Sequence, residues 1–103
     1  MAQYQLRFFF DYGGDCLWAA NDAALRRFGY PLYLPDLGLP DETLAYASEV
    51  ASQWVRLAEI AHLPENRPLL RRRLDRDAQA LLQTFRVQLG PDYEILDESG
   101  TDA

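Results

Sequence analysis

The 103-residue sequence contains no lysine, one histidine and one cysteine, Cys16. A single cysteine excludes an internal disulfide and a zinc site built from four cysteines. Apolar runs are also short, and none approaches the length of a membrane span or of a signal-peptide core. A reduced cysteine without an export signal predicts a cytoplasmic protein.

Basic charge is scarce as well: ten arginines stand against 16 acidic residues, which gives a net charge of −6. Such a surface repels phosphate backbones, so we expect a basic protein partner and no nucleic-acid binding driven by net charge. The balance is uneven along the chain. Residues 61–90 carry six arginines and three acids, whereas residues 91–103 carry five acids and no base.

What is present is enough for one small folded domain. Hydrophobic residues make up 49% of the chain, too many for disorder, and the length fits one domain with a modest core. We predict a single α+β domain over residues 1–98 and a flexible polar tail over residues 99–103.

The first third of the chain predicts a strand and then a short helix. Residues 4–10 are rich in aromatic side chains, and Leu6, Phe8 and Phe10 recur at every second position, so they share one face. Both features are typical of a β-strand. A helix is expected over Asp22–Phe28 with Asn21 as its cap, and Cys16 or Leu17 is the alternative start.

Two long helices are predicted in the second half, where apolar residues recur every three or four positions. The first is capped by Asp41 and ends at Pro64, and the second is capped by Asn66 and ends at Gly90. A last strand is expected over residues 92–98.

An isolated strand is unstable, so the two terminal strands should pair, with Tyr30–Leu34 as a candidate third strand. The short connection between the long helices predicts an antiparallel helical hairpin. The expected fold class is therefore a small two-layer α+β domain, in which the terminal strands form a sheet packed on that hairpin plus one short helix. The pattern leaves the relative direction of the strands open.

Cys16 and His62 are the only possible thiol–imidazole pair, and a thiolate with a nearby base is a catalytic nucleophile. The alternative is a small buried cysteine and a histidine at a helix end. No local signature of a cysteine enzyme accompanies the pair, so we predict no catalytic residues and no enzyme activity.

Acidic residues near the first turn could hold a divalent cation, since hard cations prefer several oxygen ligands. Asp11 and Asp15 are the candidates, with Asp36 or Asp92 as additional ligands. The spacing matches no standard calcium loop, and aspartate is common in turns. We therefore predict no metal and no cofactor.

Arginines cluster at the start of the second long helix. The cluster could hold phosphate or RNA, but Arg71 has Asp75 four residues on, the spacing of an ion pair on a solvated helix face. The pattern leaves open whether this cluster is functional; its main members are Arg71, Arg72, Arg73 and Arg76.

Acidic and aromatic residues share the two irregular stretches around residues 11–18 and 30–36. Tyrosine and tryptophan supply rigid contact area, and carboxylates steer a basic partner toward the surface. The alternative is that the rings only pack the loops onto the sheet. We predict that a partner binds through Asp11, Tyr12, Asp15, Trp18, Tyr33 and Asp36.

The two ends of the sequence resemble those of many small acidic bacterial proteins. Phe8–Trp18 has an aromatic strand, then Asp-Tyr, then Leu-Trp, and Leu89–Ile95 has Leu-Gly-x-x-Tyr-x-hydrophobic after a helix. Proteins of this kind are associated with immunity proteins of bacterial polymorphic toxin systems. The resemblance implies a cytoplasmic inhibitor that binds a toxin domain and blocks its active site, and it brings no catalytic residues.

The first functional hypothesis is therefore a non-enzymatic inhibitor of a basic cognate toxin domain. The alternatives are a structural or regulatory subunit, or a small enzyme that uses Cys16 and His62 or a carboxylate-bound metal. The identity of the partner and the oligomeric state are left open.

Overall fold

The computed structural model describes residues 2–11, 16–30, 32–59 and 67–99. These residues form one sheet, two long helices, one short helix and one 3-10 turn. In chain order the elements are β1 (Tyr4–Phe8), β2 (Leu17–Ala19), α1 (Asp22–Phe28), η1 (Leu34–Leu37), α2 (Asp41–Glu59), α3 (Arg67–Leu89) and β3 (Tyr93–Asp97).

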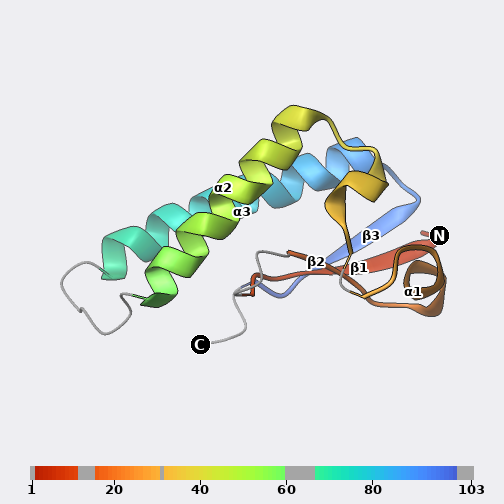
Figure 1. The fold of residues 1–103 in the computed structure, drawn as a ribbon, viewed down its shortest axis with the longest axis horizontal. Helices are drawn as coiled ribbons and strands as arrows, with labels where there is room; N and C mark the ends of the chain where they lie inside the picture. The colour runs from red at the N-terminus through yellow and green to blue at the C-terminus, as the bar shows by residue number, and fades with distance from the viewer. Residues whose placement is uncertain (1, 12–15, 31, 60–66, 100–103) are drawn as a thin grey trace.

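The architecture is the predicted two-layer α+β domain. The sheet has the order β2-β1-β3, and α2 and α3 form a long antiparallel hairpin over it (Figure 1). The hairpin is longer than the sheet, so the end of α2 and the start of α3 extend past the strands (Figure 1). The whole molecule measures 44 × 25 × 21 Å.

The terminal strands pair as predicted, and their direction is parallel. β1 and β3 run together from Tyr4 opposite Tyr93 to Phe8 opposite Asp97. A parallel pair needs a long crossover, and the intervening helices provide it. β2 then pairs antiparallel with the other side of β1.

The core lies between one face of the sheet and the hairpin. Leu6 and Phe8 are fully buried on this face, which we call the inner face, and the ring of Phe8 meets that of Phe85 on α3 at 6.1 Å. Val50 on α2 and Leu81 on α3 are also fully buried. The predicted alternation along the first strand and the apolar stripes of the helices are thus confirmed.

The short helix α1 has the predicted bounds, and Asn21 caps it as expected. The Oδ1 atom of Asn21 accepts a hydrogen bond from the backbone N–H of Ala24 at 3.0 Å, which satisfies an otherwise unpaired helix-end donor. Phe28 in the last turn packs edge-on against Tyr4, at 5.4 Å between ring centroids. The cap and this contact hold α1 at the Tyr4 end of the sheet.

The third strand is not the one predicted. Leu17–Ala19 forms β2 rather than the start of a helix, because it can pair antiparallel with the nearby β1. The segment Tyr30–Leu34 contributes one backbone hydrogen bond, from the N–H of Leu32 to the carbonyl of Leu17 at 3.3 Å. It therefore lies beside β2 without becoming a strand.

The predicted ends of the long helices are confirmed where the structure describes them, with one correction. Asp41 is the first helical residue rather than the cap, because the carbonyl of Pro40 accepts the first helix bonds, from the N–H groups of Thr43 and Leu44. The predicted stops and caps at Pro64 and Asn66 lie outside the described residues, as do residues 100–103 of the predicted tail.

Within the described part of the chain, no helix combines the length and the hydropathy needed to cross a membrane.

Candidate protein-binding surface

The sheet face opposite the hairpin, which we call the outer face, carries polar and aromatic side chains. Arg7 lies at its centre, because the register places it opposite Trp18 on β2 and opposite Leu96 on β3. Gln5 lies opposite Glu94 one step along, and its amide donates to the Glu94 carboxylate at 2.8 Å. The alternation of a strand sends these side chains away from the core.

Three rings gather at one end of the outer face. Trp18 stacks on Phe9 with ring centroids 4.8 Å apart and planes 7° apart, and its indole N–H donates to the Phe9 carbonyl at 3.1 Å. Tyr30 packs against Trp18 with ring centroids 5.1 Å apart and planes tilted by 50°. We call Phe9, Trp18 and Tyr30 the aromatic cluster. Trp18 is only 7% exposed, whereas Tyr30 is 53% exposed, so the cluster presents tyrosine to solvent.

Arg7 connects the aromatic cluster to the C-terminal strand. Its guanidinium lies 5.4 Å from the centre of the Phe9 ring and forms an ion pair with Glu98 at 2.6 Å. The hydrogen bond with Glu98, and then the Glu98 charge, raise the pKa of Arg7 above its ordinary value. The positive charge on this face is therefore already paired with a carboxylate.

The irregular segment after α1 lies next to this surface. The hydrogen bond between Leu32 and Leu17 holds the segment at the edge of β2, two residues from Tyr30. In its 3-10 turn the N–H of Asp36 donates to the Tyr33 carbonyl at 2.9 Å, which brings the two residues together. Tyr33 is 67% exposed and Asp36 is also exposed.

The structure describes four of the six predicted binding residues and places them in three groups. Trp18 is a packed member of the aromatic cluster, whereas Tyr33 and Asp36 share one exposed turn. Asp11 is exposed just after β1. Tyr12 and Asp15 lie outside the described residues.

Sequence reasoning missed Phe9 and Arg7 as part of this surface. The period of the strand already placed them together on the face opposite Phe8. The strand period could not show that Trp18 stacks on Phe9, because Trp18 reaches this face only once β2 pairs with β1.

The structure describes only part of the candidate thiol and metal sites. Cys16 is 1% exposed, and His62 lies outside the described residues. No group of three histidine, cysteine or acidic side chains in the described ranges could hold a metal ion. The candidate ligand Asp15 is again outside those ranges.

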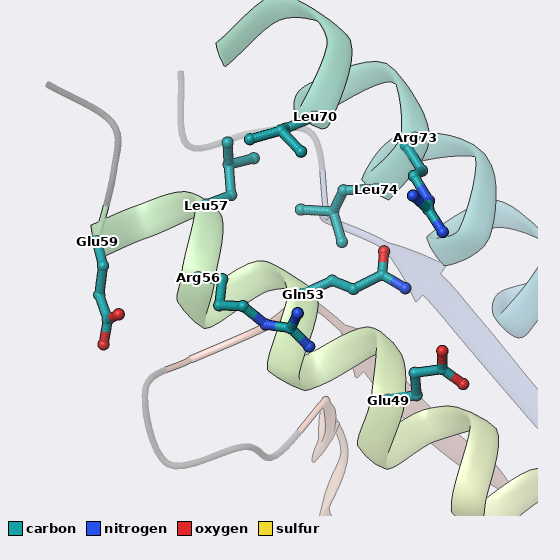
Figure 2. A pocket seen from close by; sticks show the side chains of 8 residues that line it. All are labelled: Glu49, Gln53, Arg56, Leu57, Glu59, Leu70, Arg73 and Leu74. Carbon is teal, nitrogen blue, oxygen red and sulfur yellow. The ribbon is translucent and has the colours of Figure 1, made fainter. Parts of the chain in front are cut away.

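A pocket of about 330 Å³ lies between the ends of α2 and α3 that extend past the sheet. Figure 2 shows Leu57, Leu70 and Leu74 close together in it, with Gln53 and Arg73 beside them. Its remaining lining residues are Glu49, Arg56 and Glu59. The lining contains two acidic residues and two arginines, so its charges cancel. Net charge therefore gives the pocket no preference for an anionic or a cationic ligand.

The arginine cluster at the start of α3 is partly paired. Arg71 contacts Asp75 at 3.3 Å, the ion pair expected from the spacing of four residues. Both side chains are well exposed, so such a pair contributes little to stability. Arg73 lines the pocket between the helices.

Comparisons with protein-family models, with curated proteins and with solved structures found no match.

Proposed function

We propose that this protein is a non-enzymatic inhibitor that binds a basic protein partner, most simply an immunity protein that neutralises a cognate bacterial toxin domain. The observation that carries the proposal is the exposure of two tyrosines that are close in sequence: Tyr30, which belongs to the aromatic cluster, and Tyr33, which lies at the start of η1. Large exposed aromatic rings lower the solubility of a protein, and they are enriched where proteins bind one another.

Charge supports a basic partner. The chain has a net charge of −6, and Asp11 and Asp36 are exposed near the ends of the segments that carry the rings. A toxin that cleaves nucleic acid needs a basic active site to hold phosphates, and an acidic surface is attracted to it. Electrostatic steering would also speed the association, which matters for an inhibitor that protects a cell.

The rings are held in fixed positions, and this favours the tight binding that an inhibitor needs. Trp18 is held by stacking on Phe9 and by a hydrogen bond to its carbonyl, so Tyr30 packs on a fixed partner. Rings that are already ordered lose less side-chain entropy on binding.

The test is binding to the toxin domain encoded next to this protein, measured by calorimetry at two salt concentrations. A triple variant, Asp11→Asn, Asp15→Asn and Asp36→Asn, should weaken binding at least about tenfold and flatten its salt dependence, since each neutralised contact is worth about 1 kcal/mol. Tyr33→Ala should weaken binding at both salt concentrations.

The matched control removes three charges from exposed positions of α2: Glu42→Gln, Glu49→Gln and Glu59→Gln. It changes the net charge by the same amount and should leave the affinity within about threefold. If both triple variants weaken binding equally, only net charge matters and the proposed surface is wrong. If the wild-type protein does not bind, the inhibitor proposal fails.

A further inference from the structure

β3 is an edge strand whose outer side is open. It pairs with β1 on one side, and among residues 2–11, 16–30, 32–59 and 67–99 no strand pairs with its other side. An open edge offers a row of backbone donors and acceptors to any extended segment of another chain.

The backbone bonds show which groups of β3 point outward. The carbonyl of Asp92 accepts from Tyr4, and the N–H of Glu98 donates to Phe8, each at 2.9 Å. In a parallel pair, every second residue of a strand bonds to the same neighbouring strand. The backbone groups of the even-numbered residues of β3 therefore bond to β1. The backbone groups of Tyr93, Ile95 and Asp97 therefore point to the open edge.

A shallow groove follows this edge. It has a volume of about 800 Å³ and is lined by β3 itself, by Arg86 of α3, by Gly90 and Pro91 of the turn after α3, and by Ala2 before β1. On its floor a guanidinium N–H of Arg86 donates to the Ile95 carbonyl at 2.8 Å. The N–H of Tyr93 is also used, by the Gly90 carbonyl at 3.2 Å. An added strand would bond with the outward N–H groups of Ile95 and Asp97 and with the outward carbonyl of Tyr93, and with the Ile95 carbonyl once the Arg86 guanidinium has left it.

The side chains along the edge of β3 determine which sign of charge an added segment should carry. Residues 92–98 contain four acids and no base, and Leu96 is 42% exposed between them. A second copy of this chain would bring eight carboxylates together, and like charges across strands are destabilising. A segment with lysine or arginine would instead face carboxylates, and an apolar residue would cover Leu96.

We propose that the open edge of β3 receives an extended, basic segment of the partner as an added strand. This inference rests on the proposed function for the identity of the partner, but not for the pairing itself. Main-chain bonds to Ile95 and Asp97 hold the segment, and Glu94 and Leu96 read its side chains on the outer face. Without the segment, the Arg86 guanidinium bonds to the Ile95 carbonyl and shields the middle of the edge. The added segment displaces this guanidinium.

The probe is a capped eight-residue peptide of alternating lysine and valine, with two counterparts. One counterpart has glutamate in place of every lysine, and the other has methyl groups on alternate backbone nitrogens. Amide NMR spectra and hydrogen exchange of the full-length protein report where each peptide binds. The lysine peptide should shift the Ile95 and Asp97 amides and slow their exchange, with an affinity at least about tenfold above that of either counterpart.

Two variants at one position separate the backbone from the side chain. Asp97→Ala keeps the outward N–H and should bind the lysine peptide within about threefold of wild type. Asp97→Pro removes that N–H without touching a bond to β1, and it should abolish binding. Amide spectra must show the β1–β3 pair intact in both variants.

The proposal is overturned if the lysine peptide does not bind at millimolar concentration, if it binds no better than the glutamate peptide, or if its shifts fall away from β3. The same two variants are then tested against the neighbouring toxin domain. A toxin domain that binds wild type and both variants equally would overturn the added strand as its binding mode, leave the inhibitor proposal standing and place its interface elsewhere. A toxin domain that does not bind at all would remove the inhibitor proposal and leave the peptide result unchanged.

Discussion

The two faces of the sheet are built from the same strands and do different work. Leu6 and Phe8 on the inner face are fully buried, while Arg7 between them stays accessible on the outer face. The inner face is apolar and packs on the hairpin, so its side chains contribute mainly to stability. The described part of the outer face is held by ring stacking, by the hydrogen bonds of Gln5 and Trp18 and by the Arg7–Glu98 ion pair. Its side chains can therefore change with a small cost in stability and are available for recognition.

The largest expected effect comes from a matched pair of neighbouring phenylalanines. Phe8→Ala removes a fully buried ring in contact with Phe85 and should lower the free energy of unfolding by about 3–5 kcal/mol. Phe9→Ala removes a half-buried ring of the aromatic cluster and should cost about 1 kcal/mol. Urea denaturation measures both, with Phe8→Leu as a milder inner-face variant. Equal costs would mean that the two faces do not differ.

Trp18 is the member of the outer face that most resembles a core residue. Trp18→Phe keeps a ring against Phe9 but loses the indole hydrogen bond to the Phe9 carbonyl. We expect a loss of about 1–2 kcal/mol, because a carbonyl is left without its donor. Thermal unfolding gives the loss, and a neutral result would show that water replaces the donor and that this end of the face is open.

The Arg7–Glu98 ion pair should contribute less than either ring. Both side chains are partly exposed, at 42% and 30%, so Arg7→Met should lower the free energy of unfolding by less than Phe9→Ala does. The difference between wild type and Arg7→Met should shrink in high salt, where the pair is screened. Glu98→Gln is the matched variant, and a cost that does not respond to salt would point to packing on Phe9 rather than to charge.

The smallest expected effect is a pH dependence from Asp97. Burial opposes its charged form, but hydrogen bonds from Ser99 and Gln79 outweigh burial and lower the pKa of Asp97 below its ordinary value of 3.8. A lowered pKa means that the carboxylate stabilises the fold above the unfolded value, and that this stabilisation is lost as the pH falls through the folded value.

Wild-type protein should therefore lose more stability than Asp97→Asn between pH 5 and acid pH, by less than about 1 kcal/mol because Asp97 is exposed. Denaturant unfolding at several pH values below about 5 measures the difference. Parallel curves for the two proteins would show that the hydrogen bonds from Ser99 and Gln79 do not favour the charged form.

Much of the fold follows from local patterns. The bounds of α1 come from an asparagine cap and a closing glycine, and the hairpin comes from two long apolar stripes joined by a short link. The candidate surface is less predictable. Tyr33 and Asp36 meet in a short turn close in sequence, but Phe9, Trp18 and Tyr30 meet only through the pairing of β1 with β2.

Local chemistry thus decided the type of most elements, because capping, helix-breaking residues and hydrophobic period act over a few residues. Three features could be seen only in the folded structure. They are the pairing of β2 with β1, the parallel direction of β3, and the open edge of β3 that this arrangement leaves. β1 pairs with β2, which follows it closely in sequence, and with β3 near the other end of the chain, and several partners satisfy the same alternation. Only the packing of the sheet on the hairpin selects among them.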